Sequence, residues 1–442
     1  MRGGSLASGG RSLTKDSETR SLYYYGGAQL TIVRRSIVSR SDGLSEWTET
    51  VSRNLPHLRK PQATVLALWS YGVSMTRCCG RGTVATFLAL LLQQKVATVQ
   101  QRLYEWCLDA PDKAGAKRTH LEVSSCFVPL LSWIVRLWSS SQLALTLDAT
   151  TLSDRFVVLA VSVVYRGCAI PVAWTILPAG EKRAWRRDWL RMLRLLRPAL
   201  PADWTVLVLA DRGLSARWLY RRIVRLGWHP FLRINQGAKF RPAGQANWFW
   251  LRELVGECGQ RWRGAGTAFV SRESQVACTL VAWWGESHAE PWFILTDLAP
   301  DGCDAQWYGL RSWCEQGFRC TKRGGWQWQQ TQMRDPARVA RLWLALAVAT
   351  LWVISVGSDL ELGPSAEAVD LPDLRPLLGV AAGARPRRTR LFRLGWLWVL
   401  VQAIRGRPVP LPTRLEPEPW PEVPEQVLPT VQLQKRLAYA YM

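Results

Sequence analysis

Two runs of apolar and β-branched residues that each end in an aspartate form the clearest pattern in the first half of the chain. They are LALTLDAT, which contains Asp148, and TVLVLADRG, which contains Asp211. Runs of this kind are typical of buried strands, and in open α/β sheets functional groups gather outside the carboxyl ends of the parallel strands. A single aspartate at a strand end is also often an N-cap or turn residue. The repeated pattern favours two strands that deliver carboxylates to one edge of a sheet.

The segment between these aspartates predicts the order of the remaining elements. FVVLAVSVVY and CAIPVAWTIL are strand-like, and Arg166-Gly167 between them is a hairpin signal. EKRAWRRDWLRMLRLLR then predicts a helix before the strand that ends at Asp211. The order β-β-β-α-β-α is that of an α/β fold with a ribonuclease-H-like core, in which the first and fourth strands are neighbours. We therefore expect Asp148 and Asp211 to lie side by side.

A third carboxylate lies in YGLRSWCEQGFRCTK, where the spacing is Tyr-x2-Arg-x3-Glu-x6-Lys. In a helix, steps of three, four and seven bring Tyr308, Arg311, Glu315 and Lys322 to one face. An Arg and a Glu four residues apart are commonly only a solvated ion pair. The position of this stretch after two strand-end aspartates favours a functional role for Glu315.

The stretch from Asp211 to Glu315 is longer than one helix and one strand require. Its short strand-like pieces, broken by Gly and Ser, predict a β-rich insertion. Apolar runs near the N-terminus predict short helices, which fit a helix-turn-helix pattern only weakly and a plain helical bundle equally well. The expected division is a flexible basic arm at 1–60, a helical N-terminal region at 61–140, a catalytic core at 141–235 and 305–358, the insertion at 236–304, and a C-terminal region at 359–442 with a basic and apolar helix and a Pro-rich tail.

Together these residues resemble the DDE transposases of bacterial insertion sequences, in the insertion-sequence-4 group that carries the Y-R-E-K signature. The resemblance covers roughly residues 143–356 and includes FLRI at 231–234 and FILTDL at 293–298. It implies a ribonuclease-H-like (DDE) core with a β-rich insertion and a helical N-terminal DNA-binding region. It also implies an endonuclease that binds terminal inverted repeats as a synaptic homodimer and transfers 3′ ends to target DNA.

The chemistry that this resemblance implies accounts for the three acids. Two divalent ions about 4 Å apart can activate the attacking oxygen and stabilise the leaving one in a displacement at phosphorus. Carboxylates suit Mg²⁺, so Asp148, Asp211 and Glu315 are the expected catalytic residues and ligands of two Mg²⁺ ions, for which Mn²⁺ is expected to substitute. Without metal, three converging carboxylates would repel one another, so we expect a loosely ordered or partly protonated site.

The resemblance also implies how DNA is held. Tyr308, Arg311 and Lys322 are expected to grip the backbone near the cleaved end, although Arg311 could instead only orient Glu315 and Lys322 could be a surface lysine. An aromatic residue of the insertion can stack on a flipped base in relatives. The candidates here are Trp283, Trp284 and Trp292, for which packing in the core is the alternative.

Composition supports a polyanionic partner. The 442 residues carry 57 Lys and Arg against 34 Asp and Glu, a net charge of +23 and a pI near 10.2. Charge alone would also suit a ribosomal or membrane-surface protein. Arginines recur at helical spacing before and after Asp211, which favours double-stranded DNA, although such stripes are also common on solvated faces. The expected contacts beyond the signature are Lys182, Arg183, Arg187, Arg212, Arg217 and Arg221, with Arg191, Arg194 and Arg225 on the same stripes.

Other classes of protein are disfavoured. The ten cysteines contain no C-x2-C pair and only four histidines are present, so no zinc site is spelled out. The N-terminus lacks the apolar core of a signal peptide. The longest apolar run, at 342–357, has 16 residues, fewer than the ~20 that a membrane span needs, and predicts a buried helix. We expect reduced thiols and a cytoplasmic protein, nucleoid-associated when bound to DNA, that does not enter the membrane.

Two other functions fit the same residues. One is a ribonuclease-H-fold nuclease that cleaves without joining. The other is a decayed or domesticated DNA-binding protein that retains the acids without using them.

Overall fold

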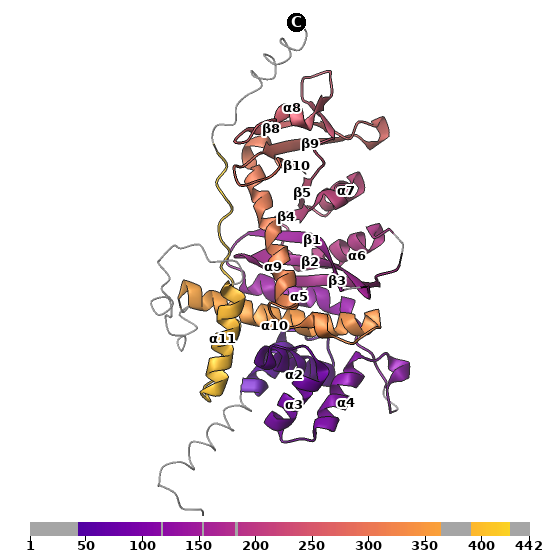
Figure 1. The fold of residues 1–442 in the computed structure, drawn as a ribbon, viewed down its shortest axis with the longest axis vertical. Coiled ribbons are helices and arrows are strands. Elements are labelled where there is room, and N and C mark those ends of the chain that lie inside the picture. The colour runs from indigo at the N-terminus through magenta and orange to yellow at the C-terminus, as the bar shows by residue number, and fades with distance from the viewer. Residues whose placement is uncertain (1–42, 116–117, 153, 182–183, 364–389, 425–442) are drawn as a thin grey trace, which may run out of the picture.

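The computed structural model describes residues 43–115, 118–152, 154–181, 184–363 and 390–424 (Figure 1). Within them, one mixed sheet of ten strands has the order β3-β2-β1-β4-β5-β10-β9-β8-β6-β7. The strands are β1 (Gln142–Leu152), β2 (Phe156–Tyr165), β3 (Cys168–Pro178), β4 (Thr205–Ala210), β5 (His229–Arg233), β6 (Lys239–Pro242), β7 (Phe249–Trp250), β8 (Arg261–Ala268), β9 (Val276–Trp283) and β10 (Trp292–Thr296). The α-helices are α2 (Lys60–Thr76), α3 (Arg81–Leu92), α4 (Val96–Cys107), α5 (Phe127–Leu137), α6 (Arg186–Leu196), α7 (Arg217–Arg225), α8 (Leu251–Leu254), α9 (Trp313–Thr321), α10 (Pro336–Leu362) and α11 (Arg390–Ile404).

The first four strands have the arrangement that the sequence predicts, and β5 follows them. β1, β2 and β3 form an antiparallel meander, and β1 pairs in parallel with β4, which pairs in parallel with β5. The predicted hairpin turns at Arg166 and Gly167, where φ is 42° and 81°; this left-handed conformation at both positions suits a two-residue turn. The predicted adjacency of the first and fourth strands is therefore confirmed.

The segment 236–304 extends the same sheet. β10 pairs antiparallel with β5 on one side and with β9 on the other, and β8, β6 and β7 follow outward. The β-rich character agrees with the pattern of short strands in the sequence. The pairing of Ile294 with Arg233 makes the insertion continuous with the central strands.

Helix α10 is the apolar helix that the sequence predicts behind the sheet. By length and composition it passes as a membrane span, but 94% of its most apolar stretch is buried inside the protein. It packs against β3, α2 and α11. The crossing with α11 is close: a Cβ built on Gly395 would lie 1.8 Å from the Val353 carbonyl oxygen, and one on Gly357 would lie 2.1 Å from the Leu391 carbonyl oxygen. Only glycine allows the two backbones to approach in this way.

The expectation of a flexible arm at 1–60 is wrong for its last part. Residues 43–54 are helical, and Leu44, Trp47, Val51 and Leu55 are buried. The Trp47 ring stacks on Trp352 of α10, with centroids 4.1 Å apart. These apolar residues recur at helical spacing, and their burial stabilises a helix that the Ser-rich and Gly-rich surroundings obscure. Residues 1–42 lie outside the described part of the chain.

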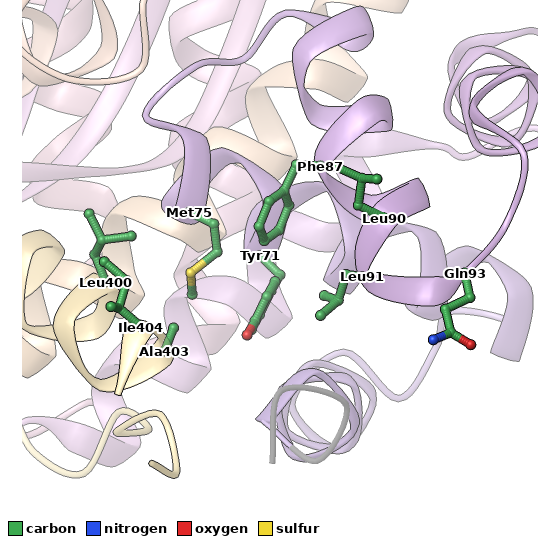
Figure 2. Close-up of a pocket in the computed structure, with 9 residues that line it drawn as sticks. All are labelled: Tyr71, Met75, Phe87, Leu90, Leu91, Gln93, Leu400, Ala403 and Ile404. Carbon is green, nitrogen blue, oxygen red and sulfur yellow. The ribbon is translucent and has the colours of Figure 1, made fainter. Parts of the chain in front are cut away.

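Helices α2 to α5 form the predicted helical N-terminal region. They pack with α10 and α11 as a helical layer beside β3 (Figure 1). An apolar groove of about 310 Å³ opens between α2, α3 and α11. Figure 2 shows side chains that line it, among them Tyr71, Phe87 and Ile404. Leu90 at its rim is 77% exposed.

Residues 407–424 of the Pro-rich tail are extended and form a strap held at successive points. The Trp352 indole donates to the Pro410 carbonyl at 2.7 Å, and the Thr413 hydroxyl donates to Asp359 at 2.6 Å. Further along, the Trp307 indole donates to the Pro421 carbonyl at 2.7 Å. Extended backbone has free carbonyl groups, and the two indoles of the folded core donate to such carbonyls here. The strap therefore runs from α11 to the segment that precedes α9.

Candidate active site

The sequence predicts Asp148 at the end of a strand, but it lies inside β1. β1 pairs with β4 only as far as Leu147 and Ala210, whereas its pairing with β2 continues to Leu152. Asp148 is thus the first residue beyond the parallel pairing. Its side chain is 20% exposed, and its Oδ1 accepts from the Ala149 amide at 2.8 Å.

Asp211 directly follows β4, as the sequence predicts. It is the N-cap of a short 3₁₀ turn, Arg212–Leu214, and its Oδ1 accepts from the Arg212 amide at 2.6 Å. Because Leu147 and Ala210 form the last pair between β1 and β4, Asp148 and Asp211 are the next residues on the two adjacent strands. The two carboxylates share one edge, where parallel strands end.

The signature residues do not lie on one helix, which corrects the predicted arrangement. Tyr308 and Arg311 belong to a 3₁₀ segment, Ala305–Ser312, which continues directly into α9 with Glu315 in its first turn; Lys322 is the C-cap. This run crosses the sheet from β9 and β10 toward β3 (Figure 1). Even so, Arg311 reaches Glu315 in the next turn at 3.1 Å, whereas Lys322 at the end of α9 turns to Thr150 and Thr151 of β1.

One guanidinium joins the three predicted acids. Arg311 Nη2 lies 3.0 Å from Asp148 Oδ2 and 3.7 Å from Asp211 Oδ2, and Nη1 lies 3.1 Å from Glu315 Oε1. The Arg311 side chain is 16% exposed, while that of Glu315 is 58% exposed. The structure therefore brings Asp148, Asp211 and Glu315 together around a single positive charge. The positive charge of Arg311 offsets the mutual repulsion of the three carboxylates. The expectation of a loosely ordered site assumed that no cation lies among them.

Cys314 is a member of this cluster that sequence reasoning missed. Its thiol donates to Asp148 Oδ2 at 2.9 Å, the same oxygen that Arg311 contacts. Burial, and then the neighbouring Asp148 carboxylate, raise the pKa of the Cys314 thiol, so the group is a neutral donor. The only signal for it in the sequence is its position next to Glu315.

Tyr308 and Lys322 lie on either side of the cluster. Tyr308 is buried with its ring edge against Trp292, centroids 5.2 Å apart, and its hydroxyl has no hydrogen-bond partner. Burial raises the pKa of Tyr308. Lys322 Nζ donates to the Thr150 hydroxyl at 2.7 Å and to the Thr151 carbonyl at 2.8 Å, and burial lowers its pKa. Lys322 is therefore fixed to β1 two residues beyond Asp148, which is not the placement of a free surface lysine.

A second charged group adjoins Asp211. Glu290 accepts from Arg212 at 3.0 Å and from Arg233 at 2.7 Å. Arg212 is among the predicted DNA contacts, whereas Arg233, within the FLRI motif, and Glu290 were not singled out. A carboxylate between two guanidinium groups marks a place where an anion is well bound.

The three candidate tryptophans are half-buried and packed against one another or their neighbours. Trp283 and Trp292 meet edge to face at 5.7 Å, and His288 lies against both. The Trp284 indole donates to the His288 carbonyl at 3.0 Å. These contacts agree with the core-packing alternative. Trp250 at the far edge of the sheet is more exposed, at 36%, with Lys239 and Arg252 over its ring.

The basic stripes lie on α6 and α7. Helix α6 begins at Arg186, later than the predicted start, and Arg187, Arg191 and Arg194 are exposed on it. Lys182 and Arg183 lie outside the described residues. On α7, Arg217 and Arg221 are half-buried. Their role as DNA contacts stays a prediction.

The donor set is compatible with a hard divalent cation, since it consists of carboxylate oxygens from three elements. Within the described ranges, however, no three His, Cys, Asp or Glu side chains stand close enough to hold a metal ion as they are. The Arg311 guanidinium occupies the point on which the carboxylates converge. All ten cysteines are free thiols, and none stands with a histidine and further cysteines in a zinc-like group.

Comparison with known proteins supports one function. Residues 180–352, less than half of the chain, match the family model described as the transposase DDE domain. The match includes Asp211 and the stretch from Tyr308 to Lys322, and it begins after Asp148. No curated protein matches the chain. The family match supports a DDE transposase, a DNA-cleaving and strand-transferring class of enzyme that generally depends on divalent metal ions.

Proposed function

We propose that the chain is the transposase of an insertion sequence in the Y-R-E-K group. It would bind the terminal inverted repeats of its element, cleave DNA at the ends and transfer the 3′ ends to target DNA. The observation that carries this proposal is the convergence of Asp148, Asp211 and Glu315 on one point at the edge of a sheet. The strand order β3-β2-β1-β4-β5, in which the first and fourth strands are neighbours, supports a ribonuclease-H-like core.

Asp148, Asp211 and Glu315 are the proposed ligands of two Mg²⁺ ions. When bound, such ions would supply Lewis-acid stabilisation of the charge that develops at the phosphorus and its oxygens. The three side chains come from a strand, a strand end and a helix, so their relative positions are fixed by the sheet and by α9. The Ala149 and Arg212 amides hold one oxygen of Asp148 and Asp211 respectively, and the other oxygen of each, which faces Arg311, is the proposed metal ligand.

The cations around the acids are the proposed grip on DNA. Lys322 is tethered to Thr150 and Thr151, so its ammonium lies close to the strand that carries Asp148 and suits a phosphate contact. Arg212 and Arg233 share Glu290, and a backbone phosphate could replace that carboxylate. Arg187, Arg217 and Arg221 would extend the contact along the duplex, which agrees with the net charge of +23.

Two ends must be cut to release an element, and the described chain carries one set of three acids. We therefore propose a homodimer in the synaptic complex, acting on the nucleoid in the cytoplasm. The N-terminal helices α2 to α5 are the proposed DNA-binding region. Trp283, Trp284 and Trp292 would stack on a flipped base only after their packing opens.

A strand-transfer assay tests the proposal. A duplex with the DNA flanking the gene, which should contain the inverted repeats, is incubated with the full chain, Mg²⁺ and a supercoiled plasmid. The expected result is cleavage at the repeat and covalent joining to the plasmid. Cleavage without joined products would instead favour a nuclease, and binding without cleavage would favour a domesticated DNA-binding protein.

A further inference from the structure

The Arg311 guanidinium makes the three acids of the candidate site share one cation. Its Nη2 contacts Asp148 and Asp211, and its Nη1 contacts Glu315. If Arg311 only oriented Glu315, or only bound DNA, its contacts with Asp148 and Asp211 would have no explanation. The guanidinium is also largely enclosed, with 16% of the side chain exposed.

In the two aspartates, the oxygen that Arg311 contacts is the one that no backbone amide holds. Asp148 Oδ1 and Asp211 Oδ1 already accept from backbone amides. Asp148 Oδ2 receives both Arg311 and the Cys314 thiol. A cation that enters between the three acids therefore meets the same Asp148 and Asp211 oxygens as Arg311, and like charges repel each other in one small volume.

We infer that Arg311 is an internal counter-ion that competes with the divalent ion for Asp148, Asp211 and Glu315, and that it is released to a DNA phosphate when metal enters. This inference rests on the proposed function. A phosphate is the natural second partner, because a guanidinium binds phosphate and carboxylate through the same pair of parallel hydrogen bonds. Arg311 Nε has no hydrogen-bond partner in this arrangement, so the side chain can form one more hydrogen bond when it turns toward a phosphate.

The competition couples the two ligands. DNA that binds Arg311 frees the carboxylates for metal, and metal that binds the carboxylates frees Arg311 for DNA; the two effects must be equal in free energy. The metal site is thereby weak in the free protein and strengthens on DNA. Such coupling confines metal-dependent cleavage to the bound complex.

Mn²⁺ binding to the full chain tests the inference without any activity measurement. Free Mn²⁺ is measured by electron paramagnetic resonance during titration of the wild type, Arg311→Gln and Arg311→Lys. Loss of the competing charge is expected to tighten binding by about tenfold in Arg311→Gln, within the usual range of coupling between sites. Arg311→Lys keeps the charge but not the forked geometry and should fall between the two.

A matched control removes a guanidinium that has no part in the proposed site. Arg263→Gln takes away a guanidinium that pairs with Asp301 and not with the three acids, and its Mn²⁺ affinity should stay within about twofold of the wild type, because a general loss of positive charge is a smaller effect. A short duplex added to the wild type should tighten Mn²⁺ binding, whereas in Arg311→Gln it should not. Thermal unfolding in EDTA and in Mn²⁺ shows whether each variant is folded.

The outcomes separate the inference from the proposed function. Equal or weaker Mn²⁺ affinity in Arg311→Gln, with the variant folded, overturns the inference and leaves the proposed function standing. An equal gain in Arg263→Gln also overturns it, since the effect would then be one of net charge. If neither the wild type nor Arg311→Gln binds Mn²⁺ with or without DNA, the proposed metal site itself is wrong, and the inference falls with it.

Discussion

Trp420 packs against Trp307, with ring centroids 5.0 Å apart, and so joins the C-terminal strap to the segment that carries Tyr308 and Arg311. The Trp307 indole also donates to the Pro421 carbonyl. Trp307 is 7% exposed. The geometry of the candidate site thus depends on residues more than a hundred positions further along the chain.

Trp420→Ala should lower the free energy of unfolding by about 1–3 kcal/mol, because it removes an aromatic pair and part of the cover over Trp307. Urea unfolding followed by tryptophan fluorescence and by far-UV circular dichroism measures the change. Trp250→Ala is the control, since that ring is exposed at the edge of the sheet, and it should change stability by less than about 1 kcal/mol. An equal loss in both variants would mean that the strap contributes nothing specific.

Neutralising any of the three acids should abolish cleavage while DNA binding persists. Asp148→Asn, Asp211→Asn and Glu315→Gln keep the shape of each side chain but remove the charge that a divalent ion requires. We expect a loss of at least about 1,000-fold in Mg²⁺-dependent cleavage, of the order seen when a main catalytic group is removed. Gel-shift binding and cleavage are measured on the same end-containing duplex.

Asp301→Asn is the matched control for these variants, because Asp301 is 95% exposed and pairs only loosely with Arg263 at 3.6 Å. It should cleave at the normal rate. A variant of Asp148, Asp211 or Glu315 that also cleaved normally would exclude that residue as a ligand.

The adjacency of Asp148 and Asp211 was predictable from sequence because it follows from local patterns. Apolar runs specify buried strands, the Arg166-Gly167 turn specifies a hairpin, and the order of elements is that of a ribonuclease-H-like core, in which β4 lies beside β1. The carboxylates lie where that reasoning puts them. The pair of Arg311 with Glu315 follows from their spacing, but the contacts of Arg311 with Asp148 and Asp211 were not predictable, because spacing within one segment does not say which distant side chains it meets.

The errors have a common physical cause. The segment around Tyr308 has helical spacing, yet it is 3₁₀ where Trp307 packs against Trp420. The helix at 43–54 is stabilised by the stacking of Trp47 on Trp352. In each case a contact distant in sequence determines the local conformation, and propensity alone is a weak guide there.

Thiol reactivity should distinguish one cysteine from the other nine. Cys258 is exposed and Cys78 half-buried, while the remaining eight are buried. Burial raises the pKa of Cys79, Cys107 and Cys126 to about 12, and a protonated, enclosed thiol reacts slowly. Ellman's reagent should therefore titrate Cys258 fast, Cys78 more slowly, and the rest only after unfolding. Cys258→Ser should remove the fast phase; a fast phase that survives in this variant would contradict the burial described for the others.

Gly395→Ala should destabilise the contact between α10 and α11. The added methyl group would meet the Val353 carbonyl oxygen at 1.8 Å, so the helices must separate, at a cost of about 2 kcal/mol or more. Gly302→Ala is the control, since nothing lies within 4 Å of the added atom. Thermal unfolding of both variants measures the difference. Equal melting temperatures would show that the two helices can move apart without cost.

Asp359 should make stability depend on pH. It is fully buried on α10, accepts from Thr413 of the strap, and lies 4.0 Å from Arg414. Burial raises the pKa of Asp359 from 3.8 to about 6, so the folded protein holds this proton more tightly than the unfolded chain does. The folded state therefore loses stability as pH rises from about 4, where the unfolded group ionises, to about 6, where the folded group does. This rise in the pKa corresponds to a loss of roughly 3 kcal/mol in the free energy of unfolding.

Asp359→Asn removes this titration and retains an oxygen that can accept from the Thr413 hydroxyl. The difference in unfolding free energy between the variant and the wild type should shift in favour of the variant between pH 4 and pH 6, and then stay constant up to pH 8. Urea unfolding at half-unit steps of pH measures it. Thr413→Val is the companion variant, because it removes the hydrogen bond that lowers the pKa of Asp359; its loss should move the end of the transition to higher pH. A difference between Asp359→Asn and the wild type that did not change with pH would mean that Asp359 is ionised throughout, with Arg414 compensating its burial.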